Sequence, residues 1–156
     1  GRQVRTLGNI YDHFTVDFEY PGGVRVTSMC RQISGCSDRI SESFTGTDGI
    51  AVIDGQTAKI NGPKFYQYEG ELNNPYIQEH IDLIRSIRNG TPLNEGKEVA
   101  ESTMTGILGR ISAYTGRTIR WDWLMNASKL DYTLPQYKFG PRPAEPVAIP
   151  GKTNPV

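Results

Sequence analysis

Asp12 and His13 form the one adjacent pair whose residue types suggest catalysis, because a carboxylate can orient an imidazole that acts as a base. They lie within Tyr11 to Tyr20, a segment that alternates apolar and polar residues as a strand with one buried face does. Neighbouring side chains of a strand point to opposite faces. We therefore expect the two side chains not to touch, and we interpret His13 as a sheet-surface histidine rather than as the base of a small hydrolase.

The sequence contains no glycine-rich pyrophosphate motif, no phosphate-binding loop and no nucleophile elbow. Its two histidines are far apart, and Cys30 and Cys36 lack the spacing of a zinc or thiol-redox site, so we expect free thiols. Trp121 and Trp123 are the residues that would stack on a sugar, although tryptophans more often serve packing. We therefore expect no catalytic residue, no cofactor-binding residue and no metal ligand in this chain.

The charge of the chain makes nucleic acid and membrane surfaces poor partners. Seventeen Lys and Arg balance seventeen Asp and Glu, which leaves no net attraction to polyanions. No apolar run approaches the roughly 20 residues that span a bilayer. No signal peptide is recognisable, and this says nothing about where the parent protein resides. The compartment is unknown, with the cytoplasm slightly favoured over export of the parent protein.

The first part of the chain has the pattern of consecutive strands separated by turns such as Pro21-Gly22-Gly23. No helix intervenes, so the strands should pair mainly antiparallel. The expected strands are Tyr11–Tyr20, Val24–Gln32, Arg39–Thr45, Ile50–Ile53, Thr57–Ile60 and Phe65–Tyr68.

Two amphipathic helices should follow. The first is capped by Asn74 and stopped at Asn89-Gly90, and the second runs from near Asn94 to Gly116. Gly106 and Gly109 lie inside the second helix, where each glycine lowers helix stability by roughly 1 kcal/mol relative to alanine. Close packing of the helix on a sheet would offset this loss. Beyond it we expect an edge strand at Thr118–Trp121 and a short helix capped by Asp122.

These elements predict an α+β fold: an open, mostly antiparallel β-sheet with helices packed on one face. Residues 1–134 form the domain, and residues 135–156, which hold six of the ten prolines, form an extended C-terminal arm. The uncovered sheet face carries mixed charges with Tyr11 and Met29, which fits a symmetric contact between copies of the chain.

The order, spacing and turns of the elements resemble the C-terminal domain of the glucose-fructose oxidoreductase/inositol dehydrogenase/MocA family. The resemblance covers roughly residues 1 to 130. It rests jointly on the hairpin Asp12–Arg25, the strand and turn Phe44–Ala51, the helix Asn74–Gly90, and the helix with its Gly-Arg exit Gly96–Arg117.

The resemblance implies a substrate-binding and oligomerisation domain of an NAD(P)-dependent sugar or polyol oxidoreductase. The family's Rossmann half would lie upstream and bind NAD or NADP, so this chain alone would be inactive. The open sheet face would build a homodimer or higher homo-oligomer. The loop after the second hairpin strand would approach the sugar through Arg31, Gln32, Ser37 and Asp38.

Two alternatives stay open. The chain would be a stand-alone, non-catalytic binding or scaffold domain if no Rossmann half precedes it. It would be part of an NAD-dependent glycosidase if the parent protein cleaves glycosides instead of oxidising a sugar.

Overall fold

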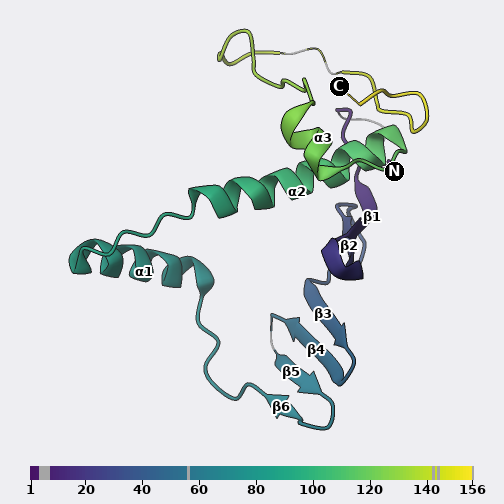
Figure 1. Cartoon of the computed structure of the whole chain (residues 1–156). Helices are drawn as coiled ribbons and strands as arrows, with labels where there is room; N and C mark the ends of the chain where they lie inside the picture. The colour runs from purple at the N-terminus through teal and green to yellow at the C-terminus, as the bar shows by residue number, and fades with distance from the viewer. Residues whose placement is uncertain (4–7, 56, 142, 144, 156) are drawn as a thin grey trace. The chain divides into compact units, whose positions relative to one another are not determined.

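The computed structural model describes residues 1–3, 8–55, 57–141, 143 and 145–155. The fold is α+β, and its sheets are open and antiparallel, which confirms the predicted class (Figure 1). The chain forms two compact units, one of Gly1–Gly35 with Glu95–Val156 and one of Cys36–Asn94. Each described strand pairs with a neighbour in the sequence, and the strands divide between a two-stranded and a four-stranded sheet.

The first unit is built on a hairpin of β1 (His13–Glu19) and β2 (Arg25–Arg31). Its register runs from the pair His13–Arg31 at the open end to the pair Glu19–Arg25 at the turn. The turn η1 (Pro21–Gly23) places Gly22 at φ 81°, a left-handed conformation that only glycine adopts without strain. The predicted hairpin and its turn are confirmed.

Helix α2 (Gly96–Thr115) packs along β1 and so covers one face of the hairpin (Figure 1). Phe14, Val16 and Phe18 of β1 are half-buried, whereas the residues between them are exposed. A Cβ on Gly109 would lie 2.8 Å from the Phe18 ring, but a Cβ on Gly106 would meet nothing within 4 Å. Close packing therefore explains the glycine at 109 and not the one at 106.

An aromatic cluster joins the start of the hairpin to the end of α2. The rings of Tyr11 and Tyr114 lie edge to face with centroids 4.6 Å apart, and Phe14 stacks 6.0 Å from Tyr114. Tyr11 is 8% exposed and donates its hydroxyl to the Ala148 carbonyl at 2.8 Å. Burial, with Tyr114 nearby, raises the Tyr11 pKa. The prediction that Tyr11 lies on the uncovered face is wrong, because the ring packs inward.

The proline-rich tail contacts the same helix end. Gly116 ends α2 at φ 68°, and Gly151 donates its N–H to the Thr115 carbonyl at 2.8 Å. This part of the tail therefore caps the chain's own helix, while Val147 and Ile149 remain exposed. Residues 142, 144 and 156 of the predicted arm lie outside the described residues.

The predicted edge strand at Thr118–Trp121 is wrong, because Trp121 begins helix α3 (Trp121–Asn126). The N-cap of α3 is Arg120, which makes no side-chain capping bond, so the predicted cap at Asp122 is also wrong. Asp122 lies in the first turn of α3, where the negative charge of its carboxylate interacts favourably with the helix dipole. Leu124 of the same helix is buried.

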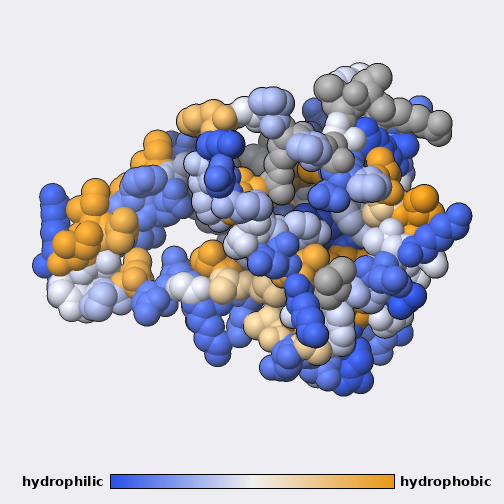
Figure 2. Space-filling view, turned by 90° about the horizontal axis from the view of Figure 1, so that it is seen from above, coloured by the Kyte–Doolittle hydropathy of each residue, from blue (hydrophilic) through white to orange (hydrophobic). Residues whose placement is uncertain are grey.

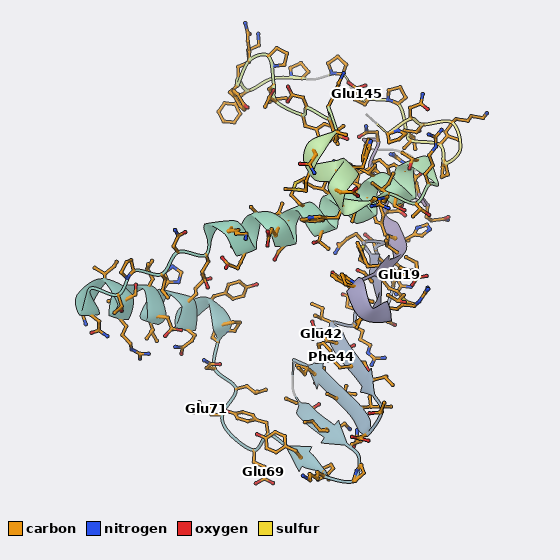
Figure 3. The ribbon with its side chains drawn as sticks, viewed as in Figure 1. Glu19, Glu42, Phe44, Glu69, Glu71 and Glu145 are labelled. Atoms are coloured by element: carbon orange, nitrogen blue, oxygen red, sulfur yellow. The ribbon has the colours of Figure 1, made fainter. Side chains whose placement is uncertain are left out.

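The second unit contains a four-stranded sheet of β3 (Ser41–Gly46), β4 (Gly49–Asp54), β5 (Ala58–Asn61) and β6 (Tyr66–Gln67), in that order. The register places an apolar set on one face, together with Glu42. Glu42 and Phe44 are labelled on β3 in Figure 3. The exposed members of this set are Phe44, Ile53, Ile60 and Tyr66.

Helix α1 (Pro75–Asn89) starts and stops as the sequence predicts. The Asn74 side chain accepts the N–H of Tyr76 at 2.9 Å, and Gly90 ends the helix at φ 66°. Its isoleucines and Leu83 remain exposed, and apolar side chains are common at the surface of the chain (Figure 2). Within the described residues, no helix combines the length and hydrophobicity that crossing a membrane requires.

Gly109→Ala should lower the stability of the first unit by about 1–3 kcal/mol, because the added methyl group overlaps the Phe18 ring in a packed contact. Gly106→Ala is the matched control and should raise stability by up to about 1 kcal/mol, since alanine favours the helix and finds open space. Urea unfolding followed by tryptophan fluorescence measures both. Equal effects of the two substitutions would contradict the packing of α2 on β1.

Candidate functional site

The side chains of Asp12 and His13 meet at the open end of the hairpin. Nδ1 of His13 lies 2.8 Å from Oδ1 of Asp12, and the other carboxylate oxygen accepts the N–H of Gln3 at 2.7 Å. The Asp12 side chain is 11% exposed and the imidazole is 49% exposed. A largely buried carboxylate therefore orients an imidazole that solvent can reach.

This contact contradicts the sequence-based prediction that the two side chains point apart. The alternation rule applies only inside a strand, and β1 begins at His13. Asp12 precedes the strand, and its N–H donates to the Gly1 carbonyl at 3.0 Å. Asp12 thus lies at the edge of the hairpin, just before the strand, where its carboxylate turns toward the imidazole.

Two of the four predicted substrate-binding residues lie at the same end of the hairpin. Arg31 is the register partner of His13, so the two side chains share the face turned away from α2. Gln32 follows directly, and its N–H donates to the Asp12 carbonyl at 2.7 Å. Arg31 and Gln32 are both exposed. Strand pairing thus joins two segments nearly 20 residues apart in sequence into one polar group.

The other two predicted residues, Ser37 and Asp38, belong to the second compact unit. Both are exposed and lie between β2 and β3. The structure therefore brings together Arg31 and Gln32 with Asp12 and His13 within the first unit.

The chemistry available at this end of the hairpin is hydrogen bonding and proton exchange. The carboxylate holds a proton on Nδ1 of the neutral imidazole, which leaves Nε2 as the acceptor. Nε2 also faces the backbone of Gly1, because a Cβ at that residue would lie 2.5 Å from it. Cys30 and Cys36 are exposed free thiols, as predicted. Across the described residues, no group of three or more His, Cys, Asp or Glu is placed to hold a metal ion.

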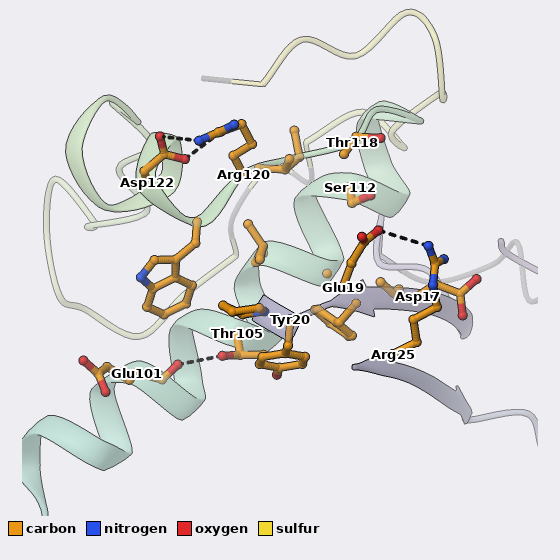
Figure 4. A pocket seen from close by; sticks show the side chains of 17 residues that line it. Asp17, Glu19, Tyr20, Arg25, Glu101, Thr105, Ser112, Thr118, Arg120 and Asp122 are labelled. Carbon is orange, nitrogen blue, oxygen red and sulfur yellow. Dashed lines mark hydrogen bonds and ion pairs between the residues drawn. The ribbon is translucent and has the colours of Figure 1, made fainter. Parts of the chain in front are cut away.

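A second feature, an open cleft, lies at the turn end of the hairpin (Figure 4). It has a volume of about 950 Å³ and is bounded by the end of β1, by α2 and by the segment that leads into α3. Because the register separates Glu19 from His13 by the length of β1, the cleft and the Asp12–His13 pair are different sites. The lining residues that bear charge or an aromatic ring are Asp17, Phe18, Glu19, Tyr20, Arg25, Glu101, Arg120, Trp121 and Asp122.

Two ion pairs border the cleft. Arg25 contacts Glu19 at 3.2 Å across the hairpin, and Arg120 holds Asp122 with bonds of 2.9 and 3.1 Å. The bond from Arg120 lowers the pKa of Asp122, so this pair is charged at neutral pH and is lost only as the pH falls through that lowered pKa. Sequence reasoning missed the cleft, because residues 118–121 were assigned to an edge strand, whereas the helix already begins at Trp121.

Asp12→Ala should change the tautomer of His13. With Asp12 present, the neutral ring should carry its proton on Nδ1, and without the carboxylate it should shift toward the Nε2–H form that free imidazoles prefer. Long-range ¹H–¹⁵N correlation spectra separate the two forms. His80 is the internal control, since its Nδ1 lies 2.7 Å from the Tyr76 carbonyl and should keep its proton in both proteins. An Nε2–H signal from His13 in the unaltered chain would contradict the pairing.

Comparison with protein-family models, with curated proteins and with solved structures finds no match for this chain. The resemblance described from the sequence therefore stays a prediction. The roles of the two sites rest on their own geometry and chemistry.

Proposed function

We propose that this chain is the substrate-binding and oligomerisation domain of an NAD(P)-dependent sugar or polyol oxidoreductase. The observation that carries the proposal is the polar group at the open end of the hairpin. There the register places Arg31 beside His13, and the Gln32 backbone bonds to Asp12. The proposal assigns binding of the sugar to this group.

The composition of this group suits a hydroxyl-rich ligand. Vicinal hydroxyls both donate and accept, and they bind well to a site that mixes guanidinium and amide donors with imidazole and amide acceptors. Hydrogen bonds to charged groups such as Arg31 contribute about 1.5–3 kcal/mol each. The half-exposed His13 ring lies within the same group, where it can exchange a proton with a ligand hydroxyl.

The residues of this chain do not fit a dinucleotide. The sequence has no Gly-x-Gly-x-x-Gly turn, and the described strands pair only antiparallel, so they form no strand-helix-strand cradle for a pyrophosphate. The proposal therefore assigns the nicotinamide chemistry to another part of the parent protein, and the role proposed for this chain is to bind and position the substrate.

Titration of the ¹⁵N-labelled chain with myo-inositol and glucose should shift the amide signals of residues 31 and 32 and the ring signals of His13. Arg31→Ala should weaken this binding roughly tenfold or more, because it removes a charge-assisted hydrogen bond. Arg85→Ala on α1 is the matched control, since it removes an exposed guanidinium paired with Asp82 and should leave the affinity unchanged.

Calorimetry with NAD and NADP should give no binding to this chain. Sugar-dependent shifts confined to other residues, or equal affinities of the Arg31 and Arg85 variants, would contradict the assignment of the site. Absence of sugar binding in a chain that still self-associates would favour the alternative of a non-catalytic scaffold domain.

The oligomerisation part of the proposal rests on the face of the hairpin turned away from α2. The register places Thr15, Asp17, Thr27 and Met29 together on that face, and Met29 is 74% exposed among these polar neighbours. In a two-fold contact the same residues meet from both copies. Met29 near the axis would then pack against its symmetry mate and lose its exposure to water.

Met29→Glu should shift the chain toward the monomer in sedimentation-velocity experiments, because two like charges would meet near the two-fold axis. Met125→Glu is the matched control, since Met125 is also exposed but lies on α3 and away from that face. An unaltered chain that sediments as a monomer at high concentration, or equal effects of both substitutions, would contradict a contact through this face.

A further inference from the structure

The outer edge of β1 presents backbone groups that β2 does not use. Asp12 and Tyr20 each bond across the hairpin, the Asp12 carbonyl at 2.7 Å and the Tyr20 N–H at 2.8 Å. Because only every second residue of an antiparallel pair bonds to the partner strand, the even-numbered residues of β1 face β2. The residues that turn their N–H and C=O to the outer edge are Thr15, Asp17 and Glu19. Among the described strands β1 pairs with β2 alone, so this edge is open.

The first residue of the chain shows how a further strand would occupy that edge. The nitrogen of Gly1 donates to the His13 carbonyl at 2.8 Å, and the Gly1 carbonyl accepts the N–H of His13 at 3.4 Å. Such a mutual exchange is the pattern of a hydrogen-bonded antiparallel pair. The residues after Gly1 run toward Asp12, whose carboxylate accepts the N–H of Gln3. Residues before Gly1 would therefore run the other way, along β1 toward Glu19.

The cleft at the turn end of the hairpin lies along the same edge. Residues 16–20 of β1 line it, whereas β2 contributes only Arg25. On the other side it is lined by α2 and by the segment before α3, which contribute Leu108 and Ile119. A neighbouring strand lies about 4.8 Å away in a sheet. A strand paired with β1 would thus enter the cleft, and its side chains on one face would cover the apolar lining.

We propose that the open edge of β1 binds the stretch of the parent protein directly before Gly1, as a third antiparallel strand that fills the cleft. The inference rests on the proposed function, which places further residues upstream of this chain. Counted back from the pair of Gly1 with His13, the second, fourth and sixth residues before Gly1 would lie opposite Thr15, Asp17 and Glu19. The first, third and fifth would face α2 and should be apolar.

A designed extension tests the proposal without knowledge of the native upstream residues. Six alternating residues, Thr-Val-Thr-Val-Thr-Val, are added directly before Gly1 of the ¹⁵N-labelled full chain, so that the valines face α2. Amide hydrogen exchange at residues 15, 17 and 19 should slow at least about tenfold relative to the unextended chain, because these N–H groups gain acceptors. The amides of residues 14, 16 and 18 are the internal reference, since they face β2 in both proteins.

Two further extensions of equal length are the controls. A Gly-Ser extension should give no protection at residues 15, 17 and 19. The extension Val-Thr-Val-Thr-Val-Thr has the same composition as the first but turns its valines away from α2, so it should protect less and give a lower urea midpoint. The register itself is checked by nuclear Overhauser contacts between Hα atoms, expected from the first added residue to Phe14 and from the third to Val16.

Equal exchange at residues 15, 17 and 19 with the alternating and the Gly-Ser extensions would overturn the proposal. Protection of these amides in the unextended chain that rises with protein concentration would also overturn it, because a second copy would then hold the edge. Loss of sugar binding with the protection intact counts against the proposed function alone. Absence of protection in a chain that still binds sugar counts against the added strand alone.

Discussion

The contact of β1 with α2 is the constraint on which the first unit depends. Gly109 lets the helix approach until its backbone meets Phe18 and Val16, and the aromatic rings of Tyr11, Phe14 and Tyr114 close the same interface at one end. Large apolar side chains that are fully buried are few in the described chain, so this interface supplies most of the packing that orders the hairpin. Both sites depend on that order.

The hairpin positions one site at each end. At its open end the register places Arg31 beside His13, and at its turn end Glu19 pairs with Arg25 at the border of the cleft. Because the same helix supports both ends, the two sites share a scaffold but no residue. The open end is a mixed donor and acceptor surface, whereas the cleft is lined by aromatic and charged side chains.

The second unit has a different character. Its sheet exposes Phe44, Ile53, Ile60 and Tyr66 on one face, and α1 exposes an apolar stripe of its own.

The sequence by itself determined the strands before residue 70, the ends of α1, the C-terminal end of α2 and the antiparallel class, because alternation, the Asn74 cap and the glycines at 90 and 116 act over a few neighbouring residues. It did not determine the contact of Asp12 with His13, the inward packing of Tyr11 or the helix that starts at Trp121. Where β1 begins, and what packs on Tyr11 from residues 114 and 148, depends on contacts between distant segments. Only the tertiary structure could decide these features, and both proposed sites are built from them.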